Sequence, residues 1–403
     1  MSVLNILEEK LAETKKQGRF REFLNLERGV QDKPWATNHG QQGERRLNVW
    51  CSNDYLAMSH HPKVLLATTD AVNRVGLGTC GARSISGTSV YHTELETLLA
   101  SAYGKESALL FTTGFGANDA TLSTLCDAIP DLIVFSDELN HASMIYGIRY
   151  SKAEKKIFRH NDVAHLAELL QAADPTRPKL IAFESLYSMD GDFAPLAQIV
   201  ALAEQYQALT YLDEIHSAGV YGERGLGYAE QLGLLDKITI IQGGFGKSYG
   251  AAGGYIAAPR SVVEAVRSWA PAFVFSTSSP APVVAAALAS FKYNLEHDTQ
   301  RKHLLAIVDH LKTGLRAAGI PLVSADSHIL PLRVGDPHRN KHISKVLLDE
   351  HDIYVQPVNA PTVPAGSERL RVTPTSAHSH ADVETFLAAL SRVWAVNDLR
   401  RAG

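Results

Sequence analysis

One lysine of this chain, Lys247, lies in a glycine-rich stretch, residues 242–250, between two short apolar runs. The run before it, residues 238–241, is rich in β-branched residues and predicts a buried strand, and the run at residues 255–258 predicts a second. Glycines at such a turn let the backbone approach a ligand closely. A lysine held there can bind a phosphate as a point charge or form a Schiff base with a carbonyl group.

The sequence upstream favours the Schiff base. Asp213 and His216 follow another apolar run, residues 208–212. A lysine Schiff base with an aspartate at the pyridine nitrogen is typical of pyridoxal 5′-phosphate (PLP). A lysine among glycines is by itself usually a solvated loop residue, and an aspartate at a strand end is usually a helix cap, but the combination is far more specific. A nucleotide phosphate loop would need G-x-x-x-x-G-K-[ST] before a helix, whereas these glycines are closer together and a strand follows.

Composition limits the class of protein. The chain has 403 residues, of which 45% are hydrophobic, enough for one large domain and a smaller one. The net charge of −4 is spread without long runs, so we expect no nucleic-acid partner. No apolar stretch reaches the length of a membrane span, and the N-terminus lacks the features of a signal peptide. The cysteines and histidines have no metal-ligand spacing, so we expect a cytoplasmic protein that binds neither membrane nor metal.

Strands and helices alternate between residues 107 and 296. Strands are predicted at residues 108–111, 132–135, 179–183, 209–213, 238–242 and 254–258. This alternation predicts an α/β domain with a mostly parallel sheet and right-handed crossovers. Residues 4–29 predict one or two amphipathic helices, and the pattern changes to a small α+β arrangement after about residue 297. The expected domains are therefore a helical segment (1–46), a large α/β domain (47–296) and a small domain (297–403).

Further candidate residues lie where such a sheet would place a ligand. The turn at Thr113 and Gly114 leads from a strand into a helix, where free N–H groups can bind phosphate, although a plain turn is an equal alternative. His141 follows the next strand and can stack on a pyridine ring, although a lone histidine there is more often structural. Arg369 and Arg371 alternate on one predicted strand. One of them could bind a carboxylate, and a solvent-facing basic pair is the alternative.

From about Gly18 to Trp394 the chain resembles the α-oxoamine synthases, PLP enzymes of fold type I, and most closely their aminolevulinate branch. The matching stretches are residues 50–56, 85–88, 136–145, 158–162, 187–191, 213–216, 275–278 and 361–364. The resemblance implies a PLP-dependent transferase fold, with a large domain on a mostly parallel seven-stranded sheet and a small C-terminal α+β domain. It also implies a homodimer with a shared active site.

The resemblance assigns roles to individual residues. Lys247 would hold PLP as a Schiff base, and Asp213 would pair with the ring nitrogen. His216 would bond to the phenolic oxygen, and His141 would stack on the ring. The phosphate would be held by Thr113, Gly114 and Phe115 and, from the second subunit, by Ser276 and Thr277. The substrate contacts would come from Asn53, Ser188 and Arg371 for the amino acid, from Arg21 and Thr362 for a succinyl carboxylate, and from Ser136 and Lys155 for coenzyme A.

The chain departs from that family at four positions. Gly244 replaces a threonine that contacts the phosphate, and Ser217 replaces an alanine after the aspartate motif, adding a possible hydroxyl donor near the ring. Ala82 and Ser84 replace a threonine and an asparagine beside the substrate. The lost bulk opens space where a side chain on the substrate α-carbon would project, because crowding is the main way to reject a larger group. The sequence therefore predicts that a larger amino acid, such as alanine, serine or glutamate, is accepted; the alternative is that the loop is shifted and another side chain fills the space.

These residues predict a PLP-dependent C-acyltransferase that condenses an amino acid with an acyl-CoA, with succinyl-CoA preferred, and releases carbon dioxide to give an α-aminoketone. Lys247 would take the α-proton, and the ring kept protonated by Asp213 would act as electron sink. The alternatives are an α-oxoamine synthase with a different acyl-CoA, an aminotransferase reaction on the same fold, and a non-catalytic PLP-binding protein. The intact Lys247, Asp213 and His216 argue against the last.

Overall fold

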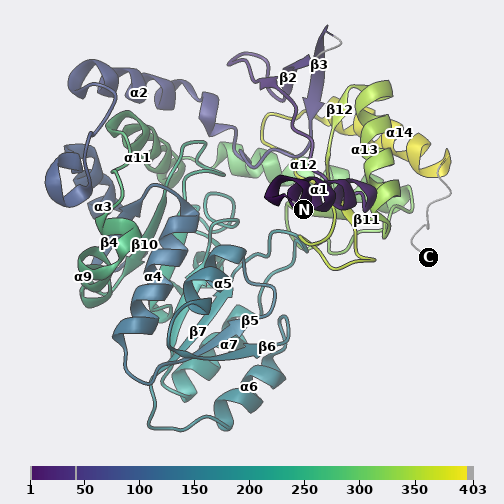
Figure 1. Cartoon of the computed structure of the whole chain (residues 1–403). Coiled ribbons are helices and arrows are strands. Elements are labelled where there is room, and N and C mark those ends of the chain that lie inside the picture. The colour runs from purple at the N-terminus through teal and green to yellow at the C-terminus, as the bar shows by residue number, and fades with distance from the viewer. Residues whose placement is uncertain (1, 41–42, 397–403) are drawn as a thin grey trace. The chain divides into compact units, whose positions relative to one another are not determined.

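The computed structural model describes residues 2–40 and 43–396 (Figure 1). The chain divides into two compact units, each treated separately below. The small unit comprises Met1–Asn53, Met189–Asp192 and Lys302–Gly403, and the large unit comprises Asp54–Ser188 and Phe193–Arg301. The predicted boundaries lay at residues 46/47 and 296/297. In the structure the change of unit falls at residues 53/54 and 301/302, and the N-terminal residues belong to the same unit as the C-terminal ones.

Within the described residues, a seven-stranded sheet forms the centre of the large unit. Its strands are β4 (Ser107–Phe111), β5 (Ile133–Asp137), β6 (Glu154–Phe158), β7 (Lys179–Glu184), β8 (Leu209–Asp213), β9 (Ile240–Gly244) and β10 (Gly254–Ala258). They lie in the order β4-β10-β9-β8-β7-β5-β6. The neighbours from β9 to β6 pair in parallel, and β10 is antiparallel to both β4 and β9. The prediction of a mostly parallel sheet is confirmed. Strand β6 was not predicted, because its charged residues hide the apolar pattern.

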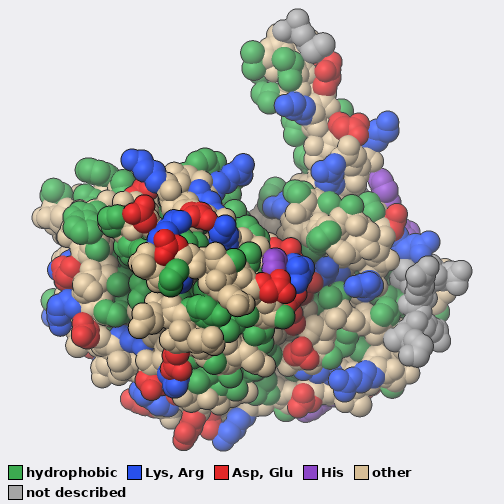
Figure 2. Space-filling model, turned by 90° about the horizontal axis from the view of Figure 1, so that it is seen from below, with side chains coloured by type: hydrophobic (Ala, Val, Ile, Leu, Met, Phe, Trp, Pro, Cys, Tyr) green, Lys and Arg blue, Asp and Glu red, His purple; other side chains and the backbone are tan. Residues whose placement is uncertain are grey.

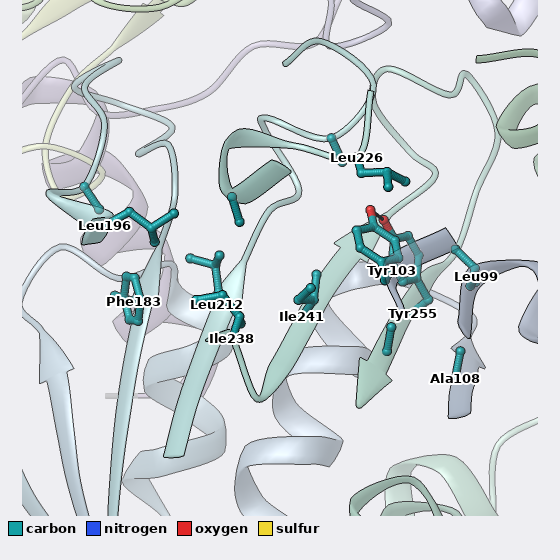
Figure 3. Packing of buried hydrophobic residues seen from close by; sticks show 14 of the residues in the cluster. Leu99, Tyr103, Ala108, Phe183, Leu196, Leu212, Leu226, Ile238, Ile241 and Tyr255 are labelled. Atoms are coloured by element: carbon teal, nitrogen blue, oxygen red, sulfur yellow. Dashed lines mark hydrogen bonds between the residues drawn. The ribbon is translucent and has the colours of Figure 1, made fainter. Parts of the chain in front are cut away.

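Helices cover both faces of this sheet. One buried cluster joins the strands to α3 (Val90–Tyr103), α6 (Val163–Gln171), α7 (Leu196–Gln205) and α11 (Ala281–Glu296). A second cluster joins the opposite face to α4 (Gly114–Ala128), α5 (Ala142–Arg149), α9 (Arg260–Trp269) and α10 (Pro271–Val274). Figure 3 shows part of the first cluster, with Phe183, Leu212, Ile241 and Tyr255 side by side on neighbouring strands. Burial on both faces explains why these strands read as continuous apolar runs.

The carboxyl ends of three central strands are level with one another. In the parallel register Glu184 of β7 is paired with Asp213 of β8, and Asp213 is paired with Gln242 of β9. Open α/β sheets bind ligands at this edge. The loops that follow these strands therefore carry the candidate site.

The remaining helices of the large unit are α2 (Pro62–Val75) and the short α8 (Tyr228–Gln231). The glycine-rich loop over residues 76–87 ends in a single π-helical turn, Arg83–Gly87. None of the helices among the described residues has the length and apolar character needed to cross a membrane. No cluster of histidine, cysteine, aspartate or glutamate in the same part of the chain is arranged to hold a metal ion.

The small unit contains two small sheets among its described residues. One joins β1 (Leu26–Glu27), β2 (Trp35–Gly40), β3 (Gly43–Val49) and β12 (Ile353–Tyr354), and the other has the order β11 (Leu330–Arg333), β14 (Arg369–Val372), β13 (Gln356–Val358). Its helices are α1 (Val3–Lys16), α12 (Thr299–Ala317), α13 (Pro337–His351) and α14 (His380–Val396). Helix α1 ends before Gly18, whose left-handed backbone (φ 68°) interrupts the helical pattern. The second helix predicted within residues 4–29 is wrong, because residues 19–25 are irregular and β1 follows at Leu26.

Candidate active site

Lys247 lies on a closed turn between β9 and β10. The turn is held by hydrogen bonds from the N–H of Phe245 to the carbonyl of Gly253 (3.0 Å) and from the N–H of Gly250 to the carbonyl of Lys247 (2.8 Å). Gly250 has φ 61°, and a Cβ there would lie 2.0 Å from the backbone nitrogen of Ser59, so no side chain fits. The Lys247 side chain is half-buried. The predicted placement of a lysine on a tight glycine turn is confirmed.

Asp213 ends β8 as a buried carboxyl with two hydrogen-bond donors. The Nδ2 of Asn118 donates to its Oδ2 at 2.8 Å, and the N–H of Ile215 donates to its Oδ1 at 2.8 Å. Burial raises the pKa of Asp213 above its usual value, and the two hydrogen bonds and the Lys247 ammonium oppose that rise. A protonated ring nitrogen would supply the compact cation that favours the charged form of this carboxyl.

A chain of hydrogen bonds links Asp213 to His141, at the start of α5. The Nδ1 of His141 accepts the N–H of Ser143 (3.2 Å) and lies 2.7 Å from the Ser143 hydroxyl. That hydroxyl accepts from Asn118, which also donates to Asp213. Because Nδ1 accepts, the neutral ring carries its proton on Nε2. Burial lowers the pKa of His141, which favours this neutral form.

His216 is buried beside Tyr55. The Nδ1 of His216 lies 2.9 Å from the Tyr55 hydroxyl, which fixes the orientation of the imidazole ring. The neighbouring Ser217 does not place a donor near the ring as expected. Its hydroxyl is fully buried and bonds instead to the Glu214 carboxyl and, at 2.7 Å, to the Ser185 hydroxyl.

The start of α4 has the geometry expected of a phosphate cradle, and the binding of phosphate there stays a prediction. Thr113 caps the helix, and its Oγ1 accepts the N–H of Gly116 at 2.9 Å. Side chains are excluded on both sides of the cradle, since a Cβ on Gly114 or Gly244 would lie 2.6 Å or 2.7 Å from Cδ1 of Ile215. Glycines and free N–H groups at a long helix start suit a phosphate. The cradle, the Asp213 carboxyl and Lys247 together fit PLP.

A second group contains four of the predicted residues, Ala82, Ser84, Ser276 and Thr277. Ala82 and Thr277 form an antiparallel bridge, and the N–H of Ser278 donates to the carbonyl of Gly81 at 3.0 Å. Ser84 follows on the same loop and is exposed. A cavity of about 30 Å³, room for about one water, lies here, and its lining includes Thr112, Gly116, Ser276 and Thr277. The structure thus pairs Thr277, expected from a second subunit, with Ala82, expected beside the substrate, and among the described residues no hydrogen bond joins Ser84 to either Ser276 or Thr277.

The coenzyme A candidates of the large unit already have protein partners. Ser136 is 2% exposed, and its hydroxyl accepts the Nδ2 of Asn140 at 2.9 Å. Lys155 donates to the carbonyls of Arg149 (2.8 Å) and Ser151 (3.1 Å), just past α5. These bonds use two of the three donors of the ammonium. A role in binding coenzyme A stays a prediction for both residues.

In the small unit, the structure brings together candidates that are far apart in the sequence. The Nη2 of Arg21 donates to Oγ1 of Thr362 at 3.0 Å, and the Nη1 of Arg371 donates to Oδ1 of Asn53 at 3.0 Å. The alternative of a solvent-facing pair at Arg369 and Arg371 is wrong, because these side chains are 3% and 7% exposed.

The two arginines of β14 have different partners. Arg369 pairs with the Asp190 carboxylate at 2.7 Å and also donates to the carbonyl of Met189. Arg371 donates to the neutral side-chain amide of Asn53, and its role in binding a substrate carboxylate stays a prediction.

The residues that orient the site were given no role from the sequence. They are Asn118, Ser143, Tyr55 and Glu184. Asn118 lies one helical turn after Gly114, which is the only sequence signal that it faces the strand ends. Ser188 was predicted to approach the cofactor. It is half-buried in the loop after β7.

Comparisons with known proteins agree with this geometry. The family model described as aminotransferase class I and II matches residues 46–390. The 5-aminolevulinate synthase of Rhodobacter capsulatus is 48% identical over 393 residues (96% of this chain and 95% of that protein). The 5-aminolevulinate synthase of Rhizobium meliloti is 49% identical over 386 residues, covering 96% of both chains.

Comparison with solved structures points to the same family. The structure of SPT with the PLP internal aldimine has a TM-score of 0.93 at 30% identity, covering 99% of this chain and 100% of that one. The serine palmitoyltransferase of Sphingomonas wittichii has a TM-score of 0.91 at 30% identity, covering 99% of both. The fold is therefore fold type I of the PLP-dependent transferases. The chain belongs to the aminotransferase class I and II family and, within it, to the α-oxoamine synthases.

Proposed function

We propose that this enzyme binds PLP through Lys247 and condenses an amino acid with succinyl-CoA, with loss of carbon dioxide, as a 5-aminolevulinate synthase does. The observation that carries the proposal is the buried Asp213 carboxyl, which is joined through Asn118 and Ser143 to the His141 imidazole and whose pKa, raised by burial, is lowered in turn by the nearby Lys247 ammonium. A carboxyl, an imidazole and a lysine in this arrangement suit a pyridine ring with a charged nitrogen. The choice of reaction is supported by the similarity of this chain to the 5-aminolevulinate synthases of Rhodobacter capsulatus and Rhizobium meliloti.

The protein side of the reaction follows from these groups. PLP, when bound, supplies a sink for the electrons released at the α-carbon of the amino acid. Asp213 holds a proton at the ring nitrogen, because a charged carboxylate in a buried place favours a cation beside it. The Lys247 amine accepts the α-proton and returns a proton later as general acid. His141, fixed by Ser143, keeps the ring face covered and excludes water.

Each substrate carboxylate has a candidate partner in the small unit. Arg371 is buried, and its planar fork matches the α-carboxylate of an amino acid. Arg21 and Thr362, already in contact, together offer charged and neutral donors to the terminal carboxylate of a succinyl group. A charge-assisted contact of this kind contributes about 1.5–3 kcal/mol, which supports succinyl-CoA over a neutral acyl chain.

The assay that tests the reaction also separates it from its alternatives. Protein loaded with PLP should show a visible absorption band that shifts when the amino acid is added, and it should release thiol from succinyl-CoA only when both substrates are present. An aminotransferase would convert the amino acid to an oxoacid without releasing thiol. A non-catalytic PLP-binding protein would give neither turnover.

We further propose a homodimer with a shared site in the cytoplasm. Large apolar side chains stand exposed beside the second group of residues: Leu77 (73%), Ile85 (82%) and Phe275 (85%). On the face that Figure 2 draws, exposed apolar side chains lie among charged ones. A second copy of this chain would cover these side chains. Ser276 and Thr277 of each copy would then lie at the phosphate cradle of the other copy.

Mixing two inactive variants tests the shared site. Lys247→Ala removes the amine, and Thr277→Arg blocks the contact expected across the interface. If each site is built from both chains, mixed dimers contain one site with neither change and regain activity. Mixed dimers that form, as shown by copurification of a tagged chain, but remain inactive would contradict the shared site.

The amino acid is proposed to be glycine or a larger one. Ala82 is half-buried on the loop that pairs with Thr277, and it carries neither the methyl nor the hydroxyl of a threonine. We expect kcat/KM for alanine or serine, at saturating succinyl-CoA, to be comparable to that for glycine. Ala82→Thr should restore discrimination by about 1–3 kcal/mol, or roughly 5- to 150-fold. Strict glycine specificity that does not change in this variant would refute the broader specificity.

A further inference from the structure

Glu184 is a buried carboxyl at the end of β7 that the proposed reaction does not use. Its side chain is 2% exposed, and its Oε1 accepts the backbone N–H of His141 at 2.6 Å. His141 is the residue that caps α5, so this bond fixes the backbone at the start of the helix. The hydroxyl of Tyr187 lies 3.4 Å from the Glu184 nitrogen and closes the same corner. Glu184 therefore holds the residue whose imidazole is expected to cover the cofactor ring.

Glu184 also lies beside the carboxyl that is expected to meet the ring nitrogen. Glu184 and Asp213 are paired in the register of β7 and β8, so their side chains leave the sheet on the same face and at the same level. Each is 2% exposed. Two carboxylates so close together in a buried place cannot both keep a charge. One of them must be neutral while the other is ionised.

The surroundings decide which of the two is neutral. Burial raises the pKa of Glu184 well above its usual value, and the charges of Asp213 and Asp137 raise it further, against the opposing effects of the His141 N–H and the Lys247 ammonium. Asp213 is better placed to keep its charge. It accepts hydrogen bonds at both oxygens, and these lower its pKa against the effect of burial.

We propose that Glu184 is a positioning residue of the active site: as a neutral carboxylic acid it anchors His141 over the cofactor and leaves the negative charge at the ring nitrogen to Asp213. A second negative charge beside Asp213 would compete for the proton that the ring nitrogen must keep. The inference rests on the proposed use of PLP but on neither substrate. It can therefore be tested by cofactor binding alone.

Two substitutions separate the two parts of this role. Glu184→Gln keeps the size and the oxygen acceptor but can carry no charge. It should leave three quantities close to those of the native protein: the Kd for PLP, the visible circular dichroism of the bound cofactor, and the pH dependence of its absorption band. Glu184→Leu leaves the His141 N–H without its acceptor. Without this anchor His141 should lose its position over the cofactor, and we expect about 5- to 150-fold weaker PLP binding with a reduced visible dichroism signal.

The experiment titrates the apo-protein with PLP and follows fluorescence quenching, with thermal unfolding of the apo-protein in parallel. Tyr103→Phe is the control for loss of a buried hydrogen bond, because it removes one hydroxyl of the Tyr103–Tyr255 pair (2.6 Å) between α3 and β10. This control should lower the unfolding temperature and leave the Kd and the dichroism of the bound cofactor unchanged. Native protein in the same titration reports on the proposed cofactor use itself.

Three results would overturn the inference. Native PLP affinity and dichroism in Glu184→Leu would show that His141 needs no anchor. A loss in Glu184→Gln as large as in Glu184→Leu, or a shifted pH profile in Glu184→Gln, would show that the carboxyl is charged. If Glu184→Leu does not fold, the Glu184→Gln result decides alone. Failure of the native protein to bind PLP would instead refute the proposed function.

Discussion

Because Ile215 packs against Gly244, the effect of Gly244→Thr on the free energy of unfolding should depend on whether residue 215 is isoleucine or valine. A Cβ on Gly244 would lie 2.7 Å from Cδ1 and 2.9 Å from Cγ1 of Ile215, closer than side chains pack. Ile215 has little room to retreat, because its Cδ1 also lies where a Cβ on Gly114 would be. Gly244→Thr should therefore destabilise the protein by about 1–3 kcal/mol, the usual effect of overpacking.

Removing Cδ1, the nearer of the two clashing Ile215 atoms, should lower the cost of the threonine but not abolish it, because Cγ1 would still lie 2.9 Å from the new Cβ. Ile215→Val deletes one methyl group, which by itself costs about 0.5–1.5 kcal/mol, and the lower end applies because Ile215 is half-buried. In the Ile215→Val background, Gly244→Thr should cost about 1–2 kcal/mol less than in the native protein, within the range measured for residues in contact. The threonine hydroxyl would then point at the phosphate cradle, so the double variant should bind PLP more tightly than the native protein.

The assay is urea unfolding of the four apo-proteins, combined with PLP titration of each. Gly246→Ala serves as the control on the same turn, because the nearest atom to its Cβ, the carbonyl oxygen of Ala251, is 4.0 Å away. This control should change the free energy of unfolding little. Equal costs of Gly244→Thr in the two backgrounds would refute the reasoning, since they would show that Ile215 does not fill the space.

Four further predictions concern the chemistry and the pH dependence of stability. Lys247→Ala should abolish the visible PLP band and steady-state turnover, and Asp213→Asn should keep the fold but lower kcat by orders of magnitude; retained turnover in the first or only a few-fold loss in the second would contradict the assigned roles. Arg21→Leu should raise KM for succinyl-CoA more than for a neutral acyl-CoA, and an equal effect on both would contradict the contact. Burial lowers the pKa of His328 to about 3 and of His378 to about 4, from 6.5. Both rings are neutral in the folded protein, so their contribution to stability is complete above pH 6.5 and is lost as the pH falls through that value towards 4 and 3. At about pH 5.5 each of the two histidines should lower the free energy of unfolding, measured in urea, by about 1.4 kcal/mol relative to its value well above pH 6.5. A free energy of unfolding that does not change over this pH range would contradict the prediction.

The sheet could be predicted where local sequence decides it. The runs at residues 209–213 and 254–258 are buried on both faces, so their apolar character is continuous and visible. Strand β6 escaped prediction because it lies at the edge of the sheet, where Lys156 and other charged side chains are tolerated. The helical prediction over residues 4–29 holds only as far as Lys16, because Gly18 ends α1 with a left-handed backbone and residues 19–25 then adopt irregular structure.

The site could be predicted only in part, because its second layer depends on contacts between distant residues. Lys247 and Asp213 could be predicted from their residue types and from their positions after predicted strands. The burial of Arg369 could not be foreseen, since its partner Asp190 comes from a segment far away in the chain. In the same way, Asn118 gains its role only through its hydrogen bond to Asp213 of β8, and its spacing from Gly114 in the sequence does not identify that partner.

The most direct test of the central claim is the product formed from glycine and succinyl-CoA by the PLP-loaded protein, with thiol release measured in the same reaction. The proposed function predicts stoichiometric release of coenzyme A and carbon dioxide together with a product of the mass of 5-aminolevulinate, and faster turnover with succinyl-CoA than with octanoyl-CoA. Conversion of the amino acid without release of thiol, or preference for the uncharged acyl chain, would contradict it.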